Sequence, residues 1–382
     1  MDGNYFKLKQ IFNFFLKNIL RFYFRFLLSL FLRTIIILTS KFKHKDNNFT
    51  HNNQNYIIIL YGGIGDLMMM SNLANNLSKN NEVTLFIDKK LNFMKNVFEK
   101  CEVIEYSSNN VIEAIKKIRK NSKDKIFLSW SSSVELMILY LISKSNSYLG
   151  FVGTYSKVFF KNKFHLNKKL NRYQIYNELY KLISKNNLDD YINDYKYRHK
   201  NKYDRYIIIH PHKTNYWGDV SIKNIEWIKF IRLILENTNL NIILVGSKKE
   251  IEKVTWIKQN LQLNKRIFDL TGKTNFQELN LLLKDSYALV TGDTGIMHLA
   301  NRFKIKIFSV FTFSDHKVYA TQNNTTVIYK KNIKCQPCVS TSKDGSDNYP
   351  PVCFNNFACS DSIKSIDIFN EFYRFYLSNE SK

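Results

Sequence analysis

The residues with the clearest capacity for chemistry lie between Tyr287 and Ala300, where an apolar run leads into Gly-Asp-Thr-Gly. Gly292 and Gly295 permit a sharp turn and a close approach of the backbone to a ligand. A helix that opens directly behind such a turn directs unpaired N–H groups toward it, which suits an anion. Thr294 adds a hydroxyl, and Asp293 adds an acceptor for a sugar or ribose hydroxyl.

His298 follows Gly295 by three residues. In a helix this spacing directs its side chain from the first turn back toward the same ligand. A simpler interpretation is also open, in which Asp293 or Thr294 only caps the helix and His298 is a satisfied, half-buried histidine. Both interpretations predict the strand, the turn and the helix, and they differ in whether a ligand binds there.

A second glycine-rich turn follows the apolar run Tyr56–Tyr61 and precedes a helical run over Leu67–Leu77. Three glycines in four positions, Gly62, Gly63 and Gly65, favour a tight strand-to-helix turn. Asp66 then stands at a helix N-terminus, on the side where open α/β sheets bind their ligands. Its carboxylate either caps this helix or acts as a catalytic base.

The elements that must position these two turns alternate between strand and helix, which indicates parallel sheets. The first series has strand-like runs at Tyr56–Tyr61, Val83–Ile87, Val103–Tyr106 and Lys125–Ser129, with helical runs at Leu67–Leu77, Asn92–Phe98 and Val111–Lys120. A helix and a charged connection fill residues 165–205. The second series begins at Tyr206 and continues with Ile225–Leu235, Ile242–Val245, Ile251–Leu261, Phe276–Leu283, Ala288–Thr291 and Lys306–Phe311.

The longer pattern Asp-Thr-Gly-x-x-His-Leu-Ala over residues 293–300 resembles the signature of glycosyltransferase family 9, the family of the lipopolysaccharide heptosyltransferases. Three further segments agree with this resemblance, namely Tyr206–Pro211, Ile242–Glu250 and Asp269–Thr274, and the resemblance spans residues 56–375. The chain also departs from the family pattern. His212 stands where the family has a glycine, and the lysine next to a tryptophan is displaced to Lys213.

The resemblance implies the GT-B fold, an α/β architecture of two Rossmann-like domains that face each other across a cleft. We expect an N-terminal acceptor domain over residues 56–200 and a C-terminal nucleotide-sugar domain over residues 201–360 with a Cys-rich loop. Residues 361–382 are expected to form a terminal helix that returns to the N-terminal domain. Ahead of these domains, residues 1–45 are predicted to be a membrane-associating basic amphipathic helix and residues 46–55 a linker.

The activity that the resemblance implies is inverting transfer of a heptose or a related sugar from a nucleotide diphosphate, with ADP-heptose as the expected donor, to a lipopolysaccharide core acceptor. No metal or other cofactor is expected for catalysis. Two alternatives remain: transfer of a different nucleotide sugar to a surface glycan, and a nucleotide-sugar binding protein that has lost catalysis. The departures at His212 and Lys213 leave the second alternative open, whereas retention of Asp66 favours an enzyme.

The resemblance also assigns roles to residues. Asp66 is the expected general base. The donor site is expected to comprise Thr294, Gly295 and Lys213 at the diphosphate, Asp293 and His298 at sugar or phosphate oxygens, and Glu250 at the ribose.

The chain has 382 residues and a formal net charge of +25, from 57 Lys and Arg against 32 Asp and Glu. This length predicts two domains of ordinary size. Such a charge suggests an anionic partner such as a phosphorylated lipid, a membrane surface or a nucleotide. A lysine-rich solvated surface, typical of AT-rich genomes, is the plainer explanation. Nucleic acid is not an expected partner, because no zinc finger, RRM-type aromatic motif or basic recognition helix is present.

The first 50 residues contain nine Lys or Arg among many Phe, Leu and Ile. Polar residues recur every four positions, at Asn13, Lys17, Arg21, Arg25, Ser29 and Arg33. A membrane-spanning helix would carry several of these cations at about 2.5–3.5 kcal/mol each, so an interfacial helix on an anionic membrane fits better. An amphipathic helix packed on the protein's own core is the alternative. We therefore expect a cytoplasmic protein, peripheral at the inner face of the cytoplasmic membrane.

Four of the five cysteines, Cys335, Cys338, Cys353 and Cys359, fall within 25 residues and begin with a Cys-x-x-Cys pair. This spacing is compatible with a structural zinc or iron–sulfur site. The same residues could equally be reduced thiols that pack a loop. The cysteine pattern is not that of a disulfide-stapled secreted protein.

Overall fold

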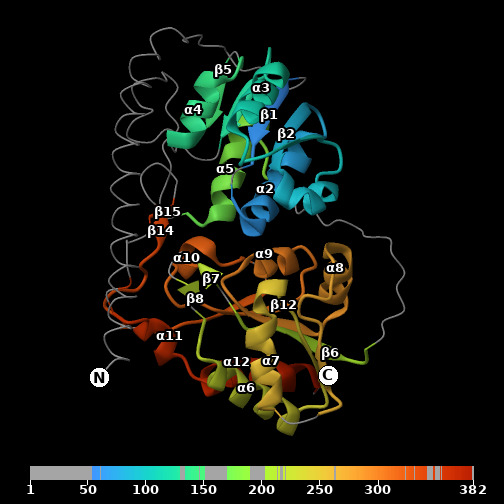
Figure 1. The fold of residues 1–382 in the computed structure, drawn as a ribbon, viewed down its shortest axis with the longest axis vertical. Helices are drawn as coiled ribbons and strands as arrows, with labels where there is room; N and C mark the ends of the chain where they lie inside the picture. The colour runs from blue at the N-terminus through green and yellow to red at the C-terminus, as the bar shows by residue number, and fades with distance from the viewer. Residues whose placement is uncertain are drawn as a thin grey trace, which may run out of the picture.

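The computed structural model describes residues 54–380 except 61, 130–133, 146, 151–169, 190–202, 213, 216–217, 220, 262–263, 323, 331, 342–346, 349–352 and 354. The predicted amphipathic helix of residues 1–45 lies outside the described residues, as does Lys213. The described chain forms two α/β units, one above the other along the long axis of the molecule (Figure 1). Within the described residues, no helix is both long and apolar enough to cross a membrane.

The first unit has a parallel five-stranded sheet with strand order β3-β2-β1-β4-β5. Its strands are β1 (Asn55–Ile59), β2 (Glu82–Asp88), β3 (Glu102–Tyr106), β4 (Ile126–Ser129) and β5 (Ser147–Gly150). Its helices are α2 (Ile64–Leu77), the 3-10 helix η1 (Lys89–Val97), α3 (Val111–Asn121), α4 (Val134–Ile142) and α5 (Arg172–Ser184).

The second unit has a parallel six-stranded sheet with strand order β10-β9-β6-β11-β12-β13. The strands are β6 (Tyr206–His210), β9 (Asn241–Leu244), β10 (Ile267–Asp269), β11 (Ala288–Gly292), β12 (Lys306–Val310) and β13 (Thr325–Ile328). The helices are α6 (Asn224–Asn237), η3 (Lys248–Glu250), α7 (Ile251–Gln259), α8 (Phe276–Asp285), α9 (Gly295–Asn301), α10 (His316–Tyr319), α11 (Ala358–Ser362) and α12 (Ser365–Glu380). Two short antiparallel pairs complete it, β7 (Thr214–Asn215) with β8 (Gly218–Asp219), and β14 (Ser340–Thr341) with β15 (Asp347–Asn348).

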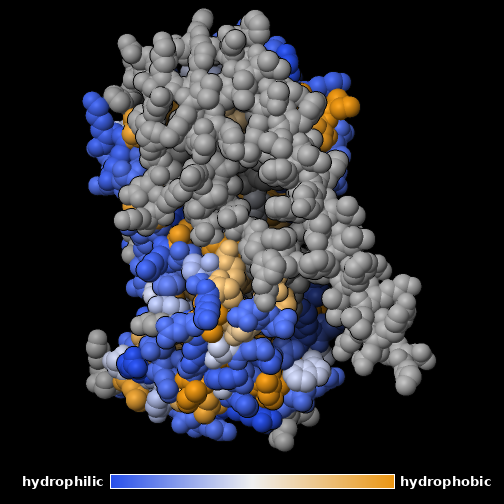
Figure 2. Space-filling view, turned by 90° about the vertical axis from the view of Figure 1, so that its left-hand side faces the viewer, coloured by the Kyte–Doolittle hydropathy of each residue, from blue (hydrophilic) through white to orange (hydrophobic). Residues whose placement is uncertain are grey.

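The central strands are uninterrupted apolar runs because helices cover both faces of each sheet. Ile57–Ile59 of β1 and Ile207–Ile209 of β6 are at most 1% exposed. The predicted alternation of strands and helices is confirmed, with boundaries that shift by at most three residues. Asn92–Phe98, predicted as a helical run, forms part of the 3-10 helix η1. On the face shown in Figure 2, the described side chains are mostly hydrophilic and hydrophobic ones occur in small separate groups.

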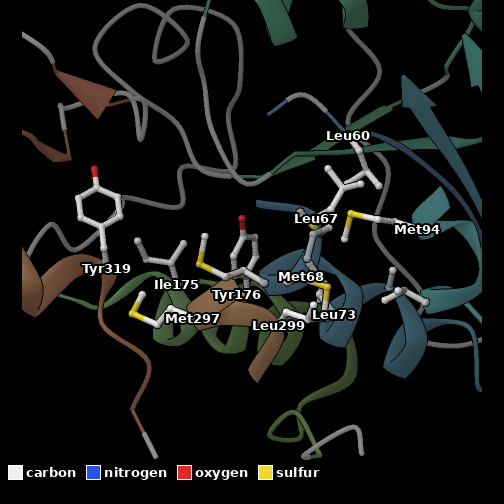
Figure 3. Close-up of a cluster of buried hydrophobic side chains, with 14 of the residues drawn as sticks. Leu60, Leu67, Met68, Leu73, Met94, Ile175, Tyr176, Met297, Leu299 and Tyr319 are labelled. Atoms are coloured by element: carbon white, nitrogen blue, oxygen red, sulfur yellow. The ribbon is translucent and has the colours of Figure 1, made fainter. Parts of the chain in front are cut away.

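The two units share one continuous hydrophobic core where α2 and α5 of the first unit face α9 and α10 of the second. Figure 3 shows Leu67 and Met68 of α2, Ile175 and Tyr176 of α5, and Met297 of α9 within this cluster. Burying a side chain of this size contributes about 1.5–3 kcal/mol. This packing therefore fixes the position and orientation of the two sheets relative to each other.

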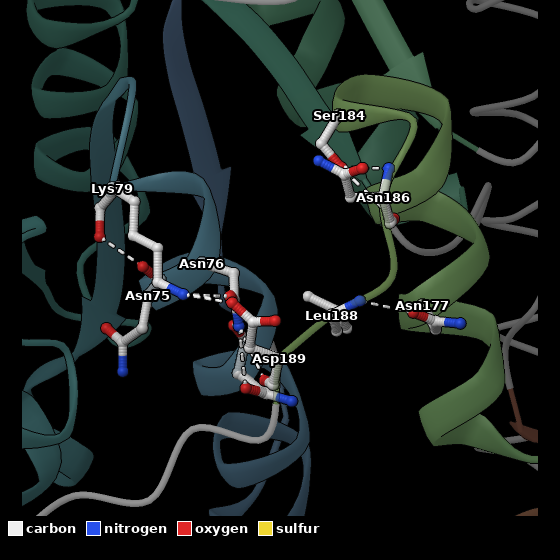
Figure 4. Close-up of polar contacts among 10 residues, drawn as sticks. Asn75, Asn76, Lys79, Asn177, Ser184, Asn186, Leu188 and Asp189 are labelled. Carbon is white, nitrogen blue, oxygen red and sulfur yellow. Dashed lines mark hydrogen bonds and ion pairs between the residues drawn. The ribbon is translucent and has the colours of Figure 1, made fainter.

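Polar contacts add to the packing around α5. Asn171, the N-cap residue of α5, donates from Nδ2 to the carbonyl oxygens of Lys317 and Ala320 in the second unit. Within the first unit, Asn76 of α2 and Lys79, which follows the C-cap of α2, bind Asp189 after the end of α5 (Figure 4). These contacts tie α5 both to α2 and to the second unit.

The terminal helix α12 corrects one expectation. Residues 361–382 were expected to return to the N-terminal domain, but α12 packs on α6, β12 and β13 of the second unit. Ile368, Phe369 and Phe372 are buried in that unit's core. The physical reason is its apolar face, which covers the outer side of the second sheet and leaves no comparable face for the first unit.

Candidate functional site

A cleft of about 1170 Å³ lies between the two units at the carboxyl ends of their strands. The first unit supplies the α2 turn and Phe93, and the second unit supplies the ends of β6, β9 and β11 with the segments that follow them. The predicted site residues that line it are Gly63, Gly65, Asp66, Glu250, Asp293, Thr294, Gly295 and His298. Residues from two glycine-rich turns, about 230 positions apart in sequence, thus meet in one cavity.

The α2 turn holds Asp66 in a defined position at the cleft wall. Gly62 has φ +145°, and a Cβ there would lie 2.4 Å from Asp66 Oδ2, so only glycine fits. The backbone N–H of Gly63 donates to Asp66 Oδ2 at 2.9 Å. The capping interpretation of Asp66 is therefore correct, and the same carboxylate also borders the cleft. An ionised carboxylate has several acceptor positions, so a capping bond and a catalytic contact are compatible.

The α9 turn presents backbone N–H groups rather than capping side chains. Thr294 is the N-cap residue of α9 and has an extended backbone, yet its side chain makes no capping hydrogen bond. Its hydroxyl instead lies 3.1 Å from that of Thr291. Asp293 accepts a hydrogen bond from Ser314 through Oδ2. The Thr294 side chain thus does not cap α9, and the first turn of this helix borders the cleft.

The two turns are in direct contact across the junction. A Cβ on Gly295 would lie 2.9 Å from Ile64 Cβ, and a Cβ on Gly65 would lie 2.9 Å from His298 Cδ2. Real Cβ atoms do not approach other atoms so closely. Glycine at both positions therefore allows the two helix N-termini, one from each unit, to meet at the same point.

His298 is 5% exposed, and its Nδ1 lies 2.8 Å from the hydroxyl of Tyr173 on α5. Burial raises the pKa of Tyr173 above its ordinary value, so this phenol stays protonated near neutrality. With its Nδ1 engaged, His298 can present only its other ring nitrogen to a ligand. Sequence alone left open a satisfied histidine or a ligand-facing one, and His298 is both hydrogen-bonded and part of the cleft lining.

Glu250 is paired with a histidine that sequence reasoning did not select. His210, the last residue of β6, places Nε2 3.6 Å from Glu250 Oε1, and the backbone N–H of Ser247 donates to the same carboxylate. Burial acts to raise the pKa of Glu250, but His210 and Ser247 outweigh it and lower the pKa from 4.5 to about 2. The sequence could have indicated His210 through its position at the end of a strand. In the structure it lies beside Thr291 of the neighbouring strand.

The Glu250 pairing predicts a pH dependence of stability. A folded pKa of about 2 against an ordinary 4.5 means that the stabilisation is present above pH 4.5 and is lost as pH falls toward 2. We expect Glu250→Gln to lower Tm by about 2–4 °C at pH 6, or roughly 1 kcal/mol. The difference from the wild type should shrink as pH falls below 4.5. A constant Tm difference from about pH 6 to about pH 3, measured by calorimetry, would contradict the pairing.

The four clustered cysteines come together in the second unit. Burial, followed by the neighbouring Cys335 thiol, raises the pKa of Cys338, so this thiol stays protonated near neutrality. Cys338 donates to the carbonyl oxygen of Cys335, and Cys353 accepts from the N–H of Phe357. No three His, Cys, Asp or Glu side chains of the described residues are arranged to hold a metal ion. A structural metal at these cysteines stays a prediction.

Residues 177–346, somewhat less than half of the chain, match the family model described as glycosyltransferase family 9 (heptosyltransferase). This region is therefore similar to glycosyltransferase family 9. The match contains most of the second unit, including Glu250 and the α9 turn. A search of curated protein sequences gives no significant match.

Several solved structures have a fold similar to that of this chain over both of its units. E. coli ADP-heptose lps heptosyltransferase II aligns with a TM-score of 0.62 at 14% identity, covering 86% of this chain and all of that one. E. coli heptosyltransferase WaaC with ADP-2-deoxy-2-fluoro heptose aligns with a TM-score of 0.58 at 16% identity, covering 72% and 92%. The iron-containing dodecameric glycosyltransferase TibC from enterotoxigenic E. coli aligns with a TM-score of 0.57 at 11% identity, covering 87% and 78%.

These comparisons confirm the family resemblance, the α/β fold of GT-B type and the assignment as a glycosyltransferase. The fold follows from two parallel sheets whose carboxyl edges face one cleft.

Proposed function

We propose that this glycosyltransferase transfers a heptose, or a related sugar, from ADP-heptose to a lipopolysaccharide core acceptor, with inversion at the anomeric carbon. The observation that carries the proposal is the single cleft that brings Asp66 from one unit opposite Glu250 and the α9 turn of the other. Support for the donor comes from the heptosyltransferase WaaC, whose structure contains an ADP-heptose analogue.

In the proposed reaction, the Asp66 carboxylate accepts the proton of the acceptor hydroxyl while that oxygen attacks the anomeric carbon. The bond between this carbon and the diphosphate oxygen breaks, and the nucleotide diphosphate leaves with the electron pair. Attack from the face opposite the leaving group inverts the centre. Asp66 begins as a carboxylate and ends protonated, and it returns its proton to solvent.

The leaving diphosphate would gain negative charge beside the first turn of α9. The backbone N–H of Gly295 and the helix dipole would stabilise such charge without reorganisation. The hydroxyl of Thr294 and a lysine, with Lys213 as our candidate, would add donors. Asp293 and His298 would hold sugar or phosphate oxygens, and the ionised Glu250 would accept from ribose hydroxyls.

Two experiments test this function. Purified protein is heated with a panel of nucleotide sugars, and the true donor is the one that raises Tm in proportion to its concentration. Transfer to a heptose-deficient lipopolysaccharide core is then followed by mass spectrometry. Protection by a different nucleotide sugar would favour the alternative of another surface glycan. Protection without transfer to any acceptor would favour a binding protein that has lost catalysis.

Location at the inner face of the cytoplasmic membrane is a further part of the proposal. It is supported by the basic, Phe-rich pattern of residues 1–45 and by the lipid-linked nature of the proposed acceptor. Such an anchor would keep the cleft close to its acceptor.

Deletion of residues 1–45 should release the protein from anionic vesicles and preserve the fold, because the first core strand begins only at Asn55. Turnover on a soluble acceptor should stay within about twofold of the full chain. Co-sedimentation with vesicles of increasing anionic content measures the release. A matched full-length variant with Lys17, Arg21, Arg25 and Arg33 replaced by Gln separates charge from apolar burial. Equal pelleting of all three proteins would refute the anchor.

A further inference from the structure

A chain of polar contacts runs along the nucleotide side of the cleft, from Glu250 through His210 to Thr294. His210 Nε2 lies 3.6 Å from Glu250 Oε1, and Nδ1 lies 3.2 Å from Thr291 Oγ1 and 3.4 Å from Thr294 Oγ1. The two threonine hydroxyls are 3.1 Å apart. Thr291 is fully buried, while His210, Glu250 and Thr294 line the cleft. One imidazole thus connects the expected ribose site with the expected diphosphate site.

The protonation state of His210 sets the direction of the hydrogen bonds in this chain. A neutral imidazole has one N–H, and the ionised Glu250 carboxylate can only accept, so the proton sits on Nε2 and Nδ1 accepts. Thr291 then donates to His210, and Thr294 donates to Thr291 or to His210. The hydroxyl protons of Thr291 and Thr294 are then both donated within this set of contacts. In this state Thr294 can offer the cleft only lone pairs, which repel a phosphate.

When His210 takes up a second proton, the hydrogen bonds that it makes with the two threonines reverse direction. Nδ1–H then donates to Thr291 or Thr294, and the hydroxyl of Thr294 is released to donate into the cleft. The imidazolium also adds a positive charge, and the Glu250 carboxylate on its other side holds that charge in place. A diphosphate would gain one hydrogen-bond donor and lose one repulsive contact.

We propose that His210 is a positioning residue that couples the binding of a nucleotide diphosphate to the uptake of one proton, by turning the Thr294 hydroxyl into a donor toward the phosphates. This inference rests on the proposed function, because it assumes that the donor diphosphate binds at the α9 turn.

Other charged groups face the same cleft. Lys249 and Lys253 stand beside Glu250 and carry positive charge, and Asp293 accepts from Ser314. Asp66 lies on the opposite wall. His212 and His298 are the other histidines of the lining, and His298 is bound to Tyr173. The chain of contacts itself involves only His210 among the histidines, so substitution at His210 and Thr294 identifies its contribution.

The experiment uses the full-length protein and ADP-ribose. This ligand is a diphosphate diester whose phosphates do not titrate between about pH 5.5 and about pH 8.5. Calorimetric titrations in two buffers of different ionisation enthalpy give the number of protons taken up per ligand bound. We expect uptake of up to about one proton at about pH 7.5, and affinity that falls by about tenfold from about pH 6 to about pH 8.5.

His210→Gln keeps an amide that can contact Glu250 and Thr291 but cannot change charge. It should bind about tenfold more weakly than the wild type at about pH 6. At about pH 8.5 it should bind within about twofold of the wild type, and proton uptake should be lost throughout. Thr294→Val, which has nearly the same shape, should also lose proton uptake, because it removes the hydroxyl that His210 reaches both directly and through Thr291. His316→Gln is the matched control, since His316 stacks on Tyr329 outside the cleft.

The outcomes separate this inference from the function on which it rests. Absence of ADP-ribose binding at every pH would overturn the adenosine diphosphate donor and this inference together. Binding of normal strength with no proton uptake, or uptake that persists in His210→Gln and Thr294→Val, would overturn the inference alone. A uniform loss of affinity in His210→Gln at all pH values would show that His210 has only a structural role.

Discussion

Asp66→Asn is expected to lower kcat by about a hundredfold or more while the donor still binds with nearly wild-type affinity. The side-chain amide of this variant would still accept from the N–H of Gly63 and preserve the turn, but it cannot take up the proton of the acceptor hydroxyl. Steady-state kinetics and calorimetric donor titration measure the two effects separately.

Asp66→Ala serves as the comparison, because it removes both the base and the bond to Gly63. It should lose the same turnover and, in addition, about 1 kcal/mol of stability, in line with the loss of a helix cap. Near-normal turnover of Asp66→Asn would remove Asp66 from the role of base. Equal loss of donor binding in both variants would instead assign it to the donor site.

Gly295→Ala is expected to lower both stability and donor affinity, because its Cβ would lie 2.9 Å from Ile64 Cβ across the junction of the two units. Neither atom is the end of a flexible side chain, so the N-termini of α2 and α9 must move apart. Overpacking of this kind costs about 1–3 kcal/mol. Because the displaced turn is also the proposed diphosphate site, donor affinity should fall about tenfold or more, and calorimetry and thermal unfolding follow both effects.

Gly63→Ala is the matched control for stability, since a Cβ at that position meets no atom within 4 Å and the backbone is extended. Its Tm should remain within about 2 °C of the wild type, within the usual range for unstrained substitutions. Ile64→Ala combined with Gly295→Ala should recover part of the lost stability, because it removes Cγ2, which lies 3.1 Å from the added Cβ. Equal Tm values for Gly295→Ala and Gly63→Ala would show that the two turns are not packed as described.

Much of the architecture could be predicted from local sequence because parallel strands buried on both faces read as apolar runs, such as Ile57–Ile59. Glycine-rich turns between strand and helix could be recognised in the same way, and with them the positions of Asp66 and Thr294. The path of α12 could not be predicted, since an amphipathic helix does not specify which of two sheets it covers.

By itself, the sequence determined the alternation of strands and helices, the two glycine turns and the resemblance to glycosyltransferase family 9, because each depends on neighbouring residues. Only the tertiary structure decided which side chains meet across the cleft. Gly65 faces His298, and His210 lies between Glu250 and Thr291, although these residues are between 40 and 233 positions apart. Such contacts depend on how two separate sheets pack, and no periodicity within either unit encodes that relation.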